Sequence, residues 1–402
     1  MHGRAIASLT LALAWPVVSA AATPAPTELR GLWVVRTALV SPQEVDKVVD
    51  AAAEAGLNAL FVQVRGRGDA FYRSSLAPRS VLLEHQPRDF DPLKRLIARA
   101  RLHGMQVHAW VNVLLSAHFG QPIPRGHVLE RHPDWAMVPK SLAAEALSAS
   151  GARRLQLVAA AGRAEGDVEG YYLSPSAPGV AQHLDDVVRE VVRAYAVDGL
   201  HLDFIRYPGP TFDYSRAALE DFRRRSGDAD LLAGPTQHPA EWDAYRRERL
   251  TSLATRLADA ARNARPGLVV SAAVVPDEAA AVNNKFQDWP SWLAAGVIHA
   301  VCPMTYTPDS RLFLQQVEAV RERTGPGQPL WAGIAAYRLD VAGIVEKVAL
   351  ARRAGAQGVV LFSHESLAPA DLRPLREGAF GERRLVWAPR DAEGAPGSAG
   401  SR

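Results

Sequence analysis

The chain has 402 residues, of which 48% are hydrophobic and 22% are charged, an ordinary composition for a globular protein with a large core. This length allows either one large α/β barrel or two smaller domains. The net charge is only +3, and the basic residues are scattered without interleaved aromatic residues, so the composition gives no support for nucleic-acid binding.

The first 22 residues have the pattern of a secretory signal. Arg4 precedes an apolar run over residues 5–18, and small residues follow at 19–22. This order is typical of a signal peptide, so we predict that residues 1–22 are removed and that the protein is exported, to the periplasm or beyond. A run of about 14 apolar residues is too short to cross a bilayer, so stable membrane insertion is not expected. The single cysteine, Cys302, leaves no disulfide framework.

The first half of the chain alternates apolar runs with amphipathic segments. Ser41 and Glu44 have the spacing of a capping box at the start of the first amphipathic segment. The predicted strands are 29–35, 59–64 and 106–112, and the predicted helices are 41–56 and 91–104.

A long irregular stretch follows the third strand. Periodicity is lost from residue 114 to about residue 175, and a loop of this length is more often functional than not. We predict that it ends in a hairpin over residues 154–172. A helix over residues 178–195 then leads into a fourth buried strand within residues 197–208.

The second half repeats the alternation after an extended segment with helical patterns over 215–226 and 241–264. Residues 391–402, rich in Gly, Ser and Ala, are predicted to form a disordered tail. The remaining predicted strands are 268–275, 298–304, 330–335 and 358–362, and the helices between them are 288–296, 309–324 and 340–354.

Eight strands that alternate with helices match a (β/α)8 TIM barrel, here with a long insertion after strand three and an extended segment after strand four. Nearly continuous apolar strands suit a parallel sheet that is covered on both faces. A doubly wound open sheet is the alternative, but the first strand lacks the Gly-x-Gly-x-x-Gly turn of its usual nucleotide site. We therefore predict one barrel domain over residues 28–380 that needs no cofactor.

Barrels of this class have their active sites at the carboxyl ends of the strands, so the polar residues after each strand are candidates. Asp203 and Arg206 end the fourth strand, just before the turn at Pro208-Gly209. Carboxylates mixed with arginines and aromatic residues suit a sugar polymer, because sugar rings stack on aromatic rings and hydroxyls bind charged groups. The other candidates are Arg65, Arg67, Asn112, Tyr207, Asp277, Glu278, Tyr306, Tyr337 and Glu365.

Glycoside hydrolysis usually needs two carboxyl groups, one protonated and one ionised. An arginine beside Asp203 would lower the pKa of this carboxyl group, so we predict that Asp203 is the nucleophile or base. A purely structural ion pair with Arg206 is the alternative. The acid is open among Glu278, Asp277 and Glu365, each of which a helix cap or a solvated loop would explain equally well.

Four motifs of the chain are similar to those of a known family. They are Glu28-Leu29-Arg30-Gly31-Leu32-Trp33-Val34, Gln63-Val64-Arg65 with Gly68-Asp69-Ala70-Phe71-Tyr72, Asp198-Gly199-Leu200-His201-Leu202-Asp203-Phe204-Ile205-Arg206-Tyr207-Pro208, and Phe362-Ser363-His364-Glu365-Ser366-Leu367. Over residues 28–370 the chain thereby resembles the glycosyl-hydrolase-like family ten, bacterial envelope TIM barrels with relatives that cleave peptidoglycan glycan strands. The resemblance implies roles for Asp203 and Arg206 first, and then for Asn112 and Glu365.

Two stretches depart from the pattern of that family. Ser174-Pro175-Ser176 has serine where the family commonly has Asp or Asn and Gly, and the region around Asp277 and Glu278 does not have the expected form. Glu278 is therefore supported only by analogy with amylase-like barrels, which pair an Asp after strand four with a Glu after strand five.

The sequence thus predicts an exported glycoside hydrolase that acts on cell-wall glycan of the peptidoglycan type. The carboxylates of muramic acid would pair with Arg65, Arg67 or Arg206. A non-catalytic barrel that binds glycan is the alternative, favoured by the two departures. Metal-dependent hydrolysis has little support, because no cluster of metal-binding residue types follows the strands. The oligomeric state does not follow from the sequence.

Overall fold

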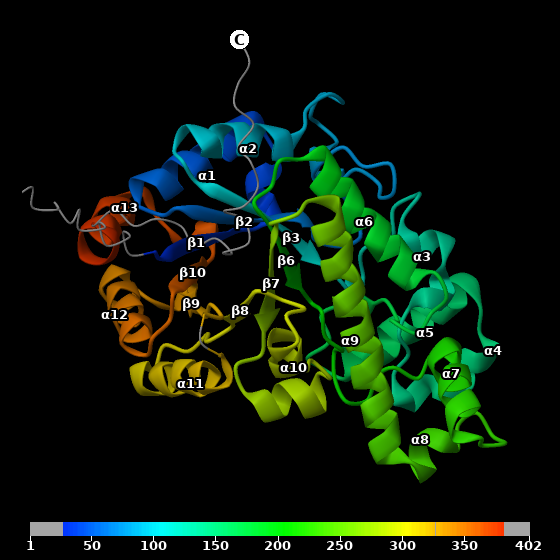
Figure 1. Cartoon of the computed structure of the whole chain (residues 1–402). Coiled ribbons are helices and arrows are strands. Elements are labelled where there is room, and N and C mark those ends of the chain that lie inside the picture. Colours follow the sequence, from blue (N-terminus) through cyan, green and yellow to red (C-terminus); the bar gives the residue numbers. More distant parts are fainter. Residues whose placement is uncertain (1–26, 326, 382–402) are drawn as a thin grey trace, which may run out of the picture.

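A computed structural model describes residues 27–325 and 327–381, so the predicted signal peptide and tail lie outside the described residues. Eight parallel strands form one sheet in the order β8-β7-β6-β3-β2-β1-β10-β9 (Figure 1). A bridge between Val301 and Leu330 joins the two outer strands, so the sheet is a nearly closed barrel and the predicted fold is confirmed. The strands are β1 (Leu29–Val34), β2 (Ala59–Arg65), β3 (Gln106–Asn112), β6 (Gly199–Asp203), β7 (Val269–Val274), β8 (Ala300–Pro303), β9 (Trp331–Ala335) and β10 (Gly358–Phe362).

In the described residues, five of the eight helices around the barrel begin at a polar side-chain cap. Ser41, Asp91, Asp288, Asp309 and Asp340 each accept a hydrogen bond from a backbone N–H in the first turn, which satisfies a donor that the helix itself leaves unpaired. In the described part of the chain, no helix has both the length and the apolar character that a membrane crossing requires. These helices are α1 (Pro42–Glu54), α2 (Pro92–Leu102), α6 (Val180–Ala194), α9 (Pro239–Ala264), α10 (Trp289–Ala294), α11 (Ser310–Arg323), α12 (Val341–Arg353) and α13 (Pro369–Leu375).

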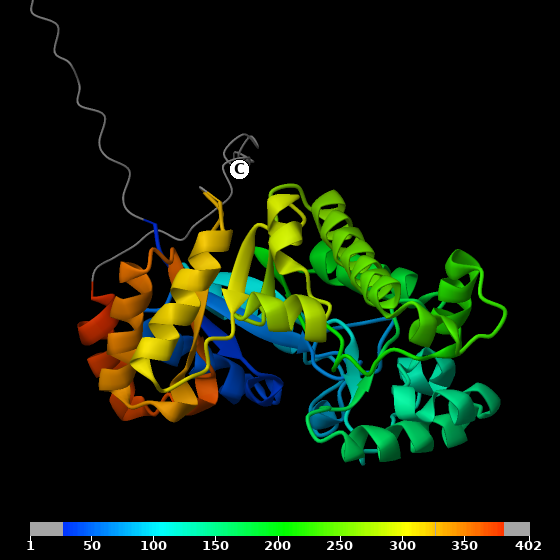
Figure 2. The ribbon, with the colours of Figure 1, turned by 90° about the horizontal axis from the view of Figure 1, so that it is seen from below.

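The insertion after β3 folds into a helical lobe at one side of the barrel (Figure 2). Its helices are α3 (Val128–Arg131), α4 (Ala143–Ser148) and α5 (Gly151–Ala164), and α7 (Arg216–Ser226) and α8 (Gly234–Gln237) lie on the same side.

The predicted hairpin over residues 154–172 is wrong, because most of this stretch belongs to α5. Buried residues recur there at helical spacing, namely Leu155, Val158, Ala159 and Gly162, and this pattern is the sequence signal of the helix. Two short strands close the lobe instead, as β4 (Leu115–Ala117) pairs antiparallel with β5 (Tyr171–Tyr172).

The interior of the barrel is filled by side chains from alternate positions of the strands, as in other barrels of eight strands. Near its middle, Trp33 Nε1 donates a hydrogen bond to His201 Nε2 over 3.1 Å, so the opposite nitrogen of His201 carries the proton and donates to Ser271 Oγ over 2.9 Å. Burial lowers the pKa of His201 well below its ordinary value, so the ring is neutral. The apolar interior consists of Leu29, Trp33, Ala59, Phe61, Trp110, Val269, Ala300, Cys302, Trp331 and Val360.

The first residue of β6 is a glycine for steric reasons. A Cβ atom at Gly199 would lie 2.2 Å from Nδ1 of His108. The His108 ring cannot move away easily, because it stacks on Phe61 with 4.6 Å between ring centroids. Gly199 therefore lets β6 and its neighbour β3 approach with their inward side chains in place.

We expect Gly199→Ala to lower the free energy of unfolding by about 1–3 kcal/mol, because the added methyl group overfills the interior. Denaturation by urea, followed by tryptophan fluorescence, measures the change. Gly209→Ala is the matched control, since a Cβ there would meet only Thr211 at 4.0 Å. Equal stability of the two variants would contradict this account of the interior packing.

Candidate active site

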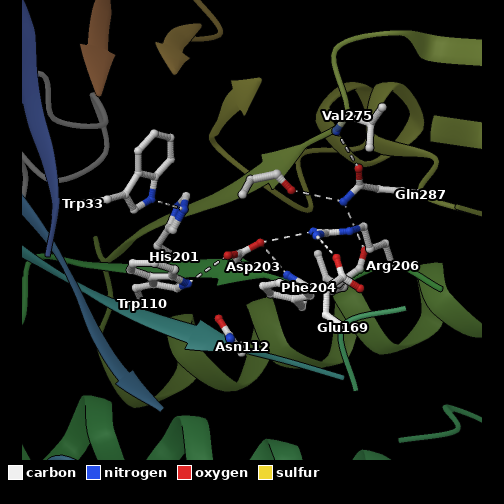
Figure 3. A network of polar contacts seen from close by, with 12 residues as sticks. Trp33, Trp110, Asn112, Glu169, His201, Asp203, Phe204, Arg206, Val275 and Gln287 are labelled. Atoms are coloured by element: carbon white, nitrogen blue, oxygen red, sulfur yellow. Dashed lines mark hydrogen bonds and ion pairs between the residues drawn. The ribbon is translucent and has the colours of Figure 1, made fainter. Parts of the chain in front are cut away.

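Asp203 ends β6 and is only 7% exposed. Its Oδ1 accepts hydrogen bonds from the backbone N–H of Phe204 over 2.6 Å and from Arg206 Nη1 over 3.3 Å, and its Oδ2 accepts one from Trp110 Nε1 over 3.1 Å (Figure 3). All three partners are N–H donors, so the surroundings bind the ionised carboxylate rather than the protonated acid.

Burial has the largest effect on the pKa of Asp203 and raises it above its ordinary value. Arg206, the N–H of Phe204 and Trp110 lower this pKa, in decreasing order of effect, but they do not outweigh burial. Arg206 does lower the pKa of Asp203, as the sequence predicted, but burial outweighs it and the net shift is upward. A buried carboxylate with a raised pKa is nearer to the pKa that a general base needs.

The turn after β6 directs Arg206 back toward Asp203. Phe204 adopts a left-handed backbone conformation with φ of 48°, and its ring lies 4.2 Å from the guanidinium carbon of Arg206. The buried side chain of Gln287 ties this turn to the end of β7, because its amide donates to the carbonyl oxygens of Ile205 and Ala273.

Glu169, a residue of the insertion, joins this network although the sequence did not single it out. Its Oε1 lies 3.7 Å from Arg206 Nη2, and the Tyr172 hydroxyl donates to its Oε2 over 2.5 Å. One guanidinium thus bridges Glu169 and Asp203 (Figure 3). The two bridged oxygens therefore lie within the separation of up to about 9.5 Å that a catalytic pair of carboxyl groups spans.

Two amide side chains, those of Asn112 and Gln63, lie between Asp203 and the loop after the first strand. Asn112 lies opposite Asp203 in the register of β3 and β6. It donates to the carbonyl oxygen of Gly66 over 2.8 Å and accepts from Gln63 Nε2 over 3.4 Å. Gln63 in turn accepts from Arg36 Nη1 over 3.2 Å. The predicted candidate Asn112 is therefore at the site, held in one orientation.

Aromatic residues lie on the opposite side of the barrel mouth. Tyr306 stacks on Phe362 with 5.4 Å between centroids, and Tyr337 meets both rings edge-on. Burial and then the negative charge of Asp203 raise the pKa of Tyr306, which therefore stays a neutral phenol. Tyr337 is 52% exposed, so an apolar ring surface is open to solvent at this side.

The three acids suggested by the sequence form local contacts instead. Glu278 pairs with Arg323 over 2.5 Å, Asp277 accepts from the N–H of Ala280, and Glu365 accepts from the hydroxyl of Thr37 over 2.6 Å. None of the contacts described for these carboxylates joins the Asp203 network. Their positions in the sequence follow strands five and eight, but their side chains serve a surface ion pair, a turn and a loop.

Two other candidates are buried in the scaffold. Arg65 is fully buried and donates to the backbone carbonyl oxygens of Asn112 and Val113 and to the hydroxyl of Ser116. Tyr207 is 1% exposed and packs edge-on against Phe286. Both side chains are buried and pack against the loops that surround the site. Arg67, by contrast, is only half-buried.

Two hollows differ in their relation to this site. One of about 520 Å³ lies between the loops after β1, β2 and β4, and Arg36, which is hydrogen-bonded to Gln63, and Arg67 line it. The other, of about 790 Å³, lies on the outer helices α6 and α9, where ion-paired side chains line it. The first is the more relevant, because it opens on the same end of the barrel as Asp203. No cluster of three or more metal-binding side chains occurs in residues 27–325 and 327–381.

A sequence model of the family described as Glycosyl hydrolase-like 10 matches residues 28–342. The chain is 26% identical to "Glycosyl hydrolase DigH" of Escherichia coli K12 over 319 residues, which cover 74% of this chain and 64% of that protein. It is 26% identical to "Glycosyl hydrolase YngK" of Bacillus subtilis over 199 residues, 45% of this chain and 34% of that protein. The chain thus spans less than two thirds of the length of these relatives.

Solved structures share the fold. The glycoside hydrolase domain of PgaB (BpsB) from Bordetella bronchiseptica superposes with a TM-score of 0.65 at 16% identity, over 89% of this chain and 100% of that domain. An alpha-L-fucosidase from Paenibacillus thiaminolyticus superposes with a TM-score of 0.61 at 16% identity, over 88% of this chain and 49% of that one. At such identities the likeness establishes the barrel and leaves the chemistry to the site itself.

We expect Arg65→Ala to lower the free energy of unfolding by about 2–4 kcal/mol, because several buried acceptors lose their donor at once. Arg67→Ala, two residues away, should change it by less than about 1 kcal/mol, because this side chain is half exposed. Chemical denaturation of the two variants compares them directly. A larger loss in Arg67→Ala than in Arg65→Ala would contradict the structural role of Arg65.

Proposed function

The chain belongs to the glycosyl hydrolase-like 10 family, and on that premise we propose that it is an exported glycoside hydrolase that cleaves peptidoglycan-type glycan strands. The observation that carries this proposal is the pair of carboxylates, Asp203 and Glu169, bridged by Arg206 at the mouth of the barrel. Hydrolysis of a glycosidic bond needs two such groups with different roles.

The surroundings of the two carboxylates divide the roles between them. Asp203 is held by three N–H donors, so it acts in its ionised form, as nucleophile or base. The side chain of Glu169 is 46% exposed, so the leaving oxygen of a bound glycan can reach it, and it serves as the general acid. In this arrangement Arg206 keeps the two carboxyl groups at a fixed relative position.

The two sides of the barrel mouth offer different contacts to a sugar, aromatic rings on one side and amide groups on the other. The exposed ring of Tyr337, with Tyr306 behind it, offers a surface on which the apolar face of a sugar can stack. Asn112 and Gln63 supply amide groups that can bind sugar hydroxyls. The signal-like residues 1–22 support export, and export would bring the enzyme to cell-wall glycan.

We expect Asp203→Asn and Glu169→Gln each to lower kcat on purified sacculi, and on glycan strands prepared from them, by about 10²–10⁴-fold. Release of soluble sugars, separated by chromatography, measures the rate. Glu278→Gln is the matched control, because its carboxylate pairs with Arg323 away from the network, and it should keep kcat within about twofold.

Full activity of Asp203→Asn would contradict its catalytic role, and full activity of Glu169→Gln would return the identity of the acid to the other carboxylates. Binding of sacculi by the unmodified chain without any release of sugars would favour the non-catalytic alternative. Near-native thermal unfolding of each variant is required before its rate is interpreted.

The pH dependence should report the electrostatic role of Arg206. Arg206 lowers the pKa of Asp203, so Arg206→Gln should raise that pKa further. The base must be ionised, so the acidic limb of the kcat/KM profile should move to higher pH in this variant. Arg206→Lys keeps the charge and should leave the limb near its original position. An unmoved limb in Arg206→Gln would show that another group sets it.

A further inference from the structure

Two arginines line the hollow of about 520 Å³ beside the Asp203 network. Arg36 follows β1, and Arg67 lies in the loop after β2. The hollow also contains Asp69, and its far wall comes from the insertion, with His118 and Gln121. We call this hollow the arginine cleft.

Neither arginine of the cleft forms an ion pair with any residue in the described part of the chain. Arg36 Nη1 donates to the amide oxygen of Gln63 over 3.2 Å, and Arg67 Nη1 donates to that of Gln121 over 2.9 Å. The one carboxylate in the cleft, Asp69, accepts from the backbone N–H of Arg67 over 3.0 Å. Two full positive charges therefore face a single negative one.

The two guanidinium groups also repel each other. Burial lowers the pKa of Arg67, and the charge of Arg36 lowers it further, whereas Asp69 raises it. An anion placed between the two arginines would relieve this repulsion and would gain charge-assisted hydrogen bonds from both. The electrostatics of the cleft thus favour a negatively charged ligand.

The loop that carries Arg67 is held in place before any ligand binds. His127 is fully buried, and its Nε2 lies 2.9 Å from the carbonyl oxygen of Arg67 and 3.0 Å from that of Ser116. Gly68 has φ of 71°, and a Cβ atom there would lie 2.3 Å from the same His127 nitrogen. The loop is therefore clamped against the insertion, which preorganises the cleft.

Hydrogen bonds link the arginine cleft to Asn112, which is the neighbour of Asp203 in the strand register. Arg36 contacts Gln63, Gln63 contacts Asn112, and Asn112 lies opposite Asp203 in the strand register. At the rim, Val81 and Leu82 are 59% and 46% exposed, and they offer an apolar surface for a sugar ring. An oligosaccharide that spans both the cleft and Asp203 would run along this end of the barrel.

We propose that the arginine cleft is a subsite for an acidic sugar, whose carboxylate binds Arg36 and Arg67. The proposal rests on the proposed function, because it places one acidic unit of the glycan beside the cleavage site. It moves the expected carboxylate contact away from Arg65, which is buried, and from Arg206, which already pairs with Asp203 and Glu169. The subsite would make the enzyme select glycan by charge.

Binding of a matched pair of ligands tests this subsite. The first is a β-1,4-linked N-acetylglucosamine tetramer with 3-O-lactyl carboxylates on alternate units, and the second is the same tetramer with these carboxylates converted to amides. Isothermal titration calorimetry is done on the full chain carrying Asp203→Asn, which prevents turnover, and on the unmodified chain at low temperature. We expect the acidic tetramer to bind about tenfold more tightly than the amide, and the preference to fall as salt is added.

Variants of the two arginines identify the source of the preference. Arg36→Gln and Arg67→Gln should each reduce the preference for the acidic tetramer, and the double variant should abolish it, so that the two tetramers bind with equal affinity. Arg36→Lys and Arg67→Lys should keep part of it. Arg373→Gln is the charge-matched control, because Arg373 is exposed on α13 and pairs with Glu377.

Equal affinity for the acidic and amide tetramers would overturn the subsite, as would a double variant that keeps the preference or a chain that binds neither ligand. A different result would refute the proposed hydrolysis while leaving the subsite in place. A chain that binds the acidic tetramer preferentially through Arg36 and Arg67, but cleaves neither tetramer nor glycan strands, would retain the subsite and refute the glycosidase.

Discussion

The burial of the Asp203 carboxylate sets the terms for the rest of the site. A carboxylate that is 7% exposed is costly unless donors replace the water that it loses. The three donors come from β3, from the backbone of the next residue and from the turn after β6. They can meet only if β3 and β6 are adjacent and the turn is fixed, which is what Gln287 achieves from the end of β7. The geometry of the site therefore depends directly on the pairing of β3 with β6 and on the fixed turn after β6.

The layer beneath Asp203 explains why its pKa is raised. Trp33, His201 and Ser271 form a closed chain of hydrogen bonds in the barrel interior, and the neutral His201 contributes no compensating charge. Cys302 shares this dry interior, where burial and the charge of Asp203 raise the pKa of the thiol. Arg206 brings a positive charge to Asp203, but the same guanidinium group also pairs with Glu169. The site thus holds the Asp203 carboxylate in a form that can act as a base, because its negative charge is only partly compensated.

The sequence was sufficient for the barrel and for the position of Asp203 at the end of a strand, because both depend on local signals. Apolar runs of strand length mark the eight strands, and a carboxylate at the end of a strand faces the mouth of a parallel barrel. Glu169 could not be found this way, since it reaches the site only through the pairing of β4 with β5. Conversely, Glu278 follows a strand as Asp203 does, but its side chain turns to Arg323. The position of a residue after a strand predicts that it lies at the carboxyl end of the barrel, but it does not predict where its side chain points.

The insertion after β3 builds both working parts of the mouth at once. At one end of its small sheet, Ala117 and the following His118 form a wall of the arginine cleft. At the other, Tyr172 of β5 holds Glu169 against Arg206. Because β4 and β5 are paired, a shift of one strand moves the cleft and the second carboxylate together. The spacing between the acidic subsite and the cleavage point is thereby fixed by a single element, so selection of the substrate and placement of the acid are coupled in the fold.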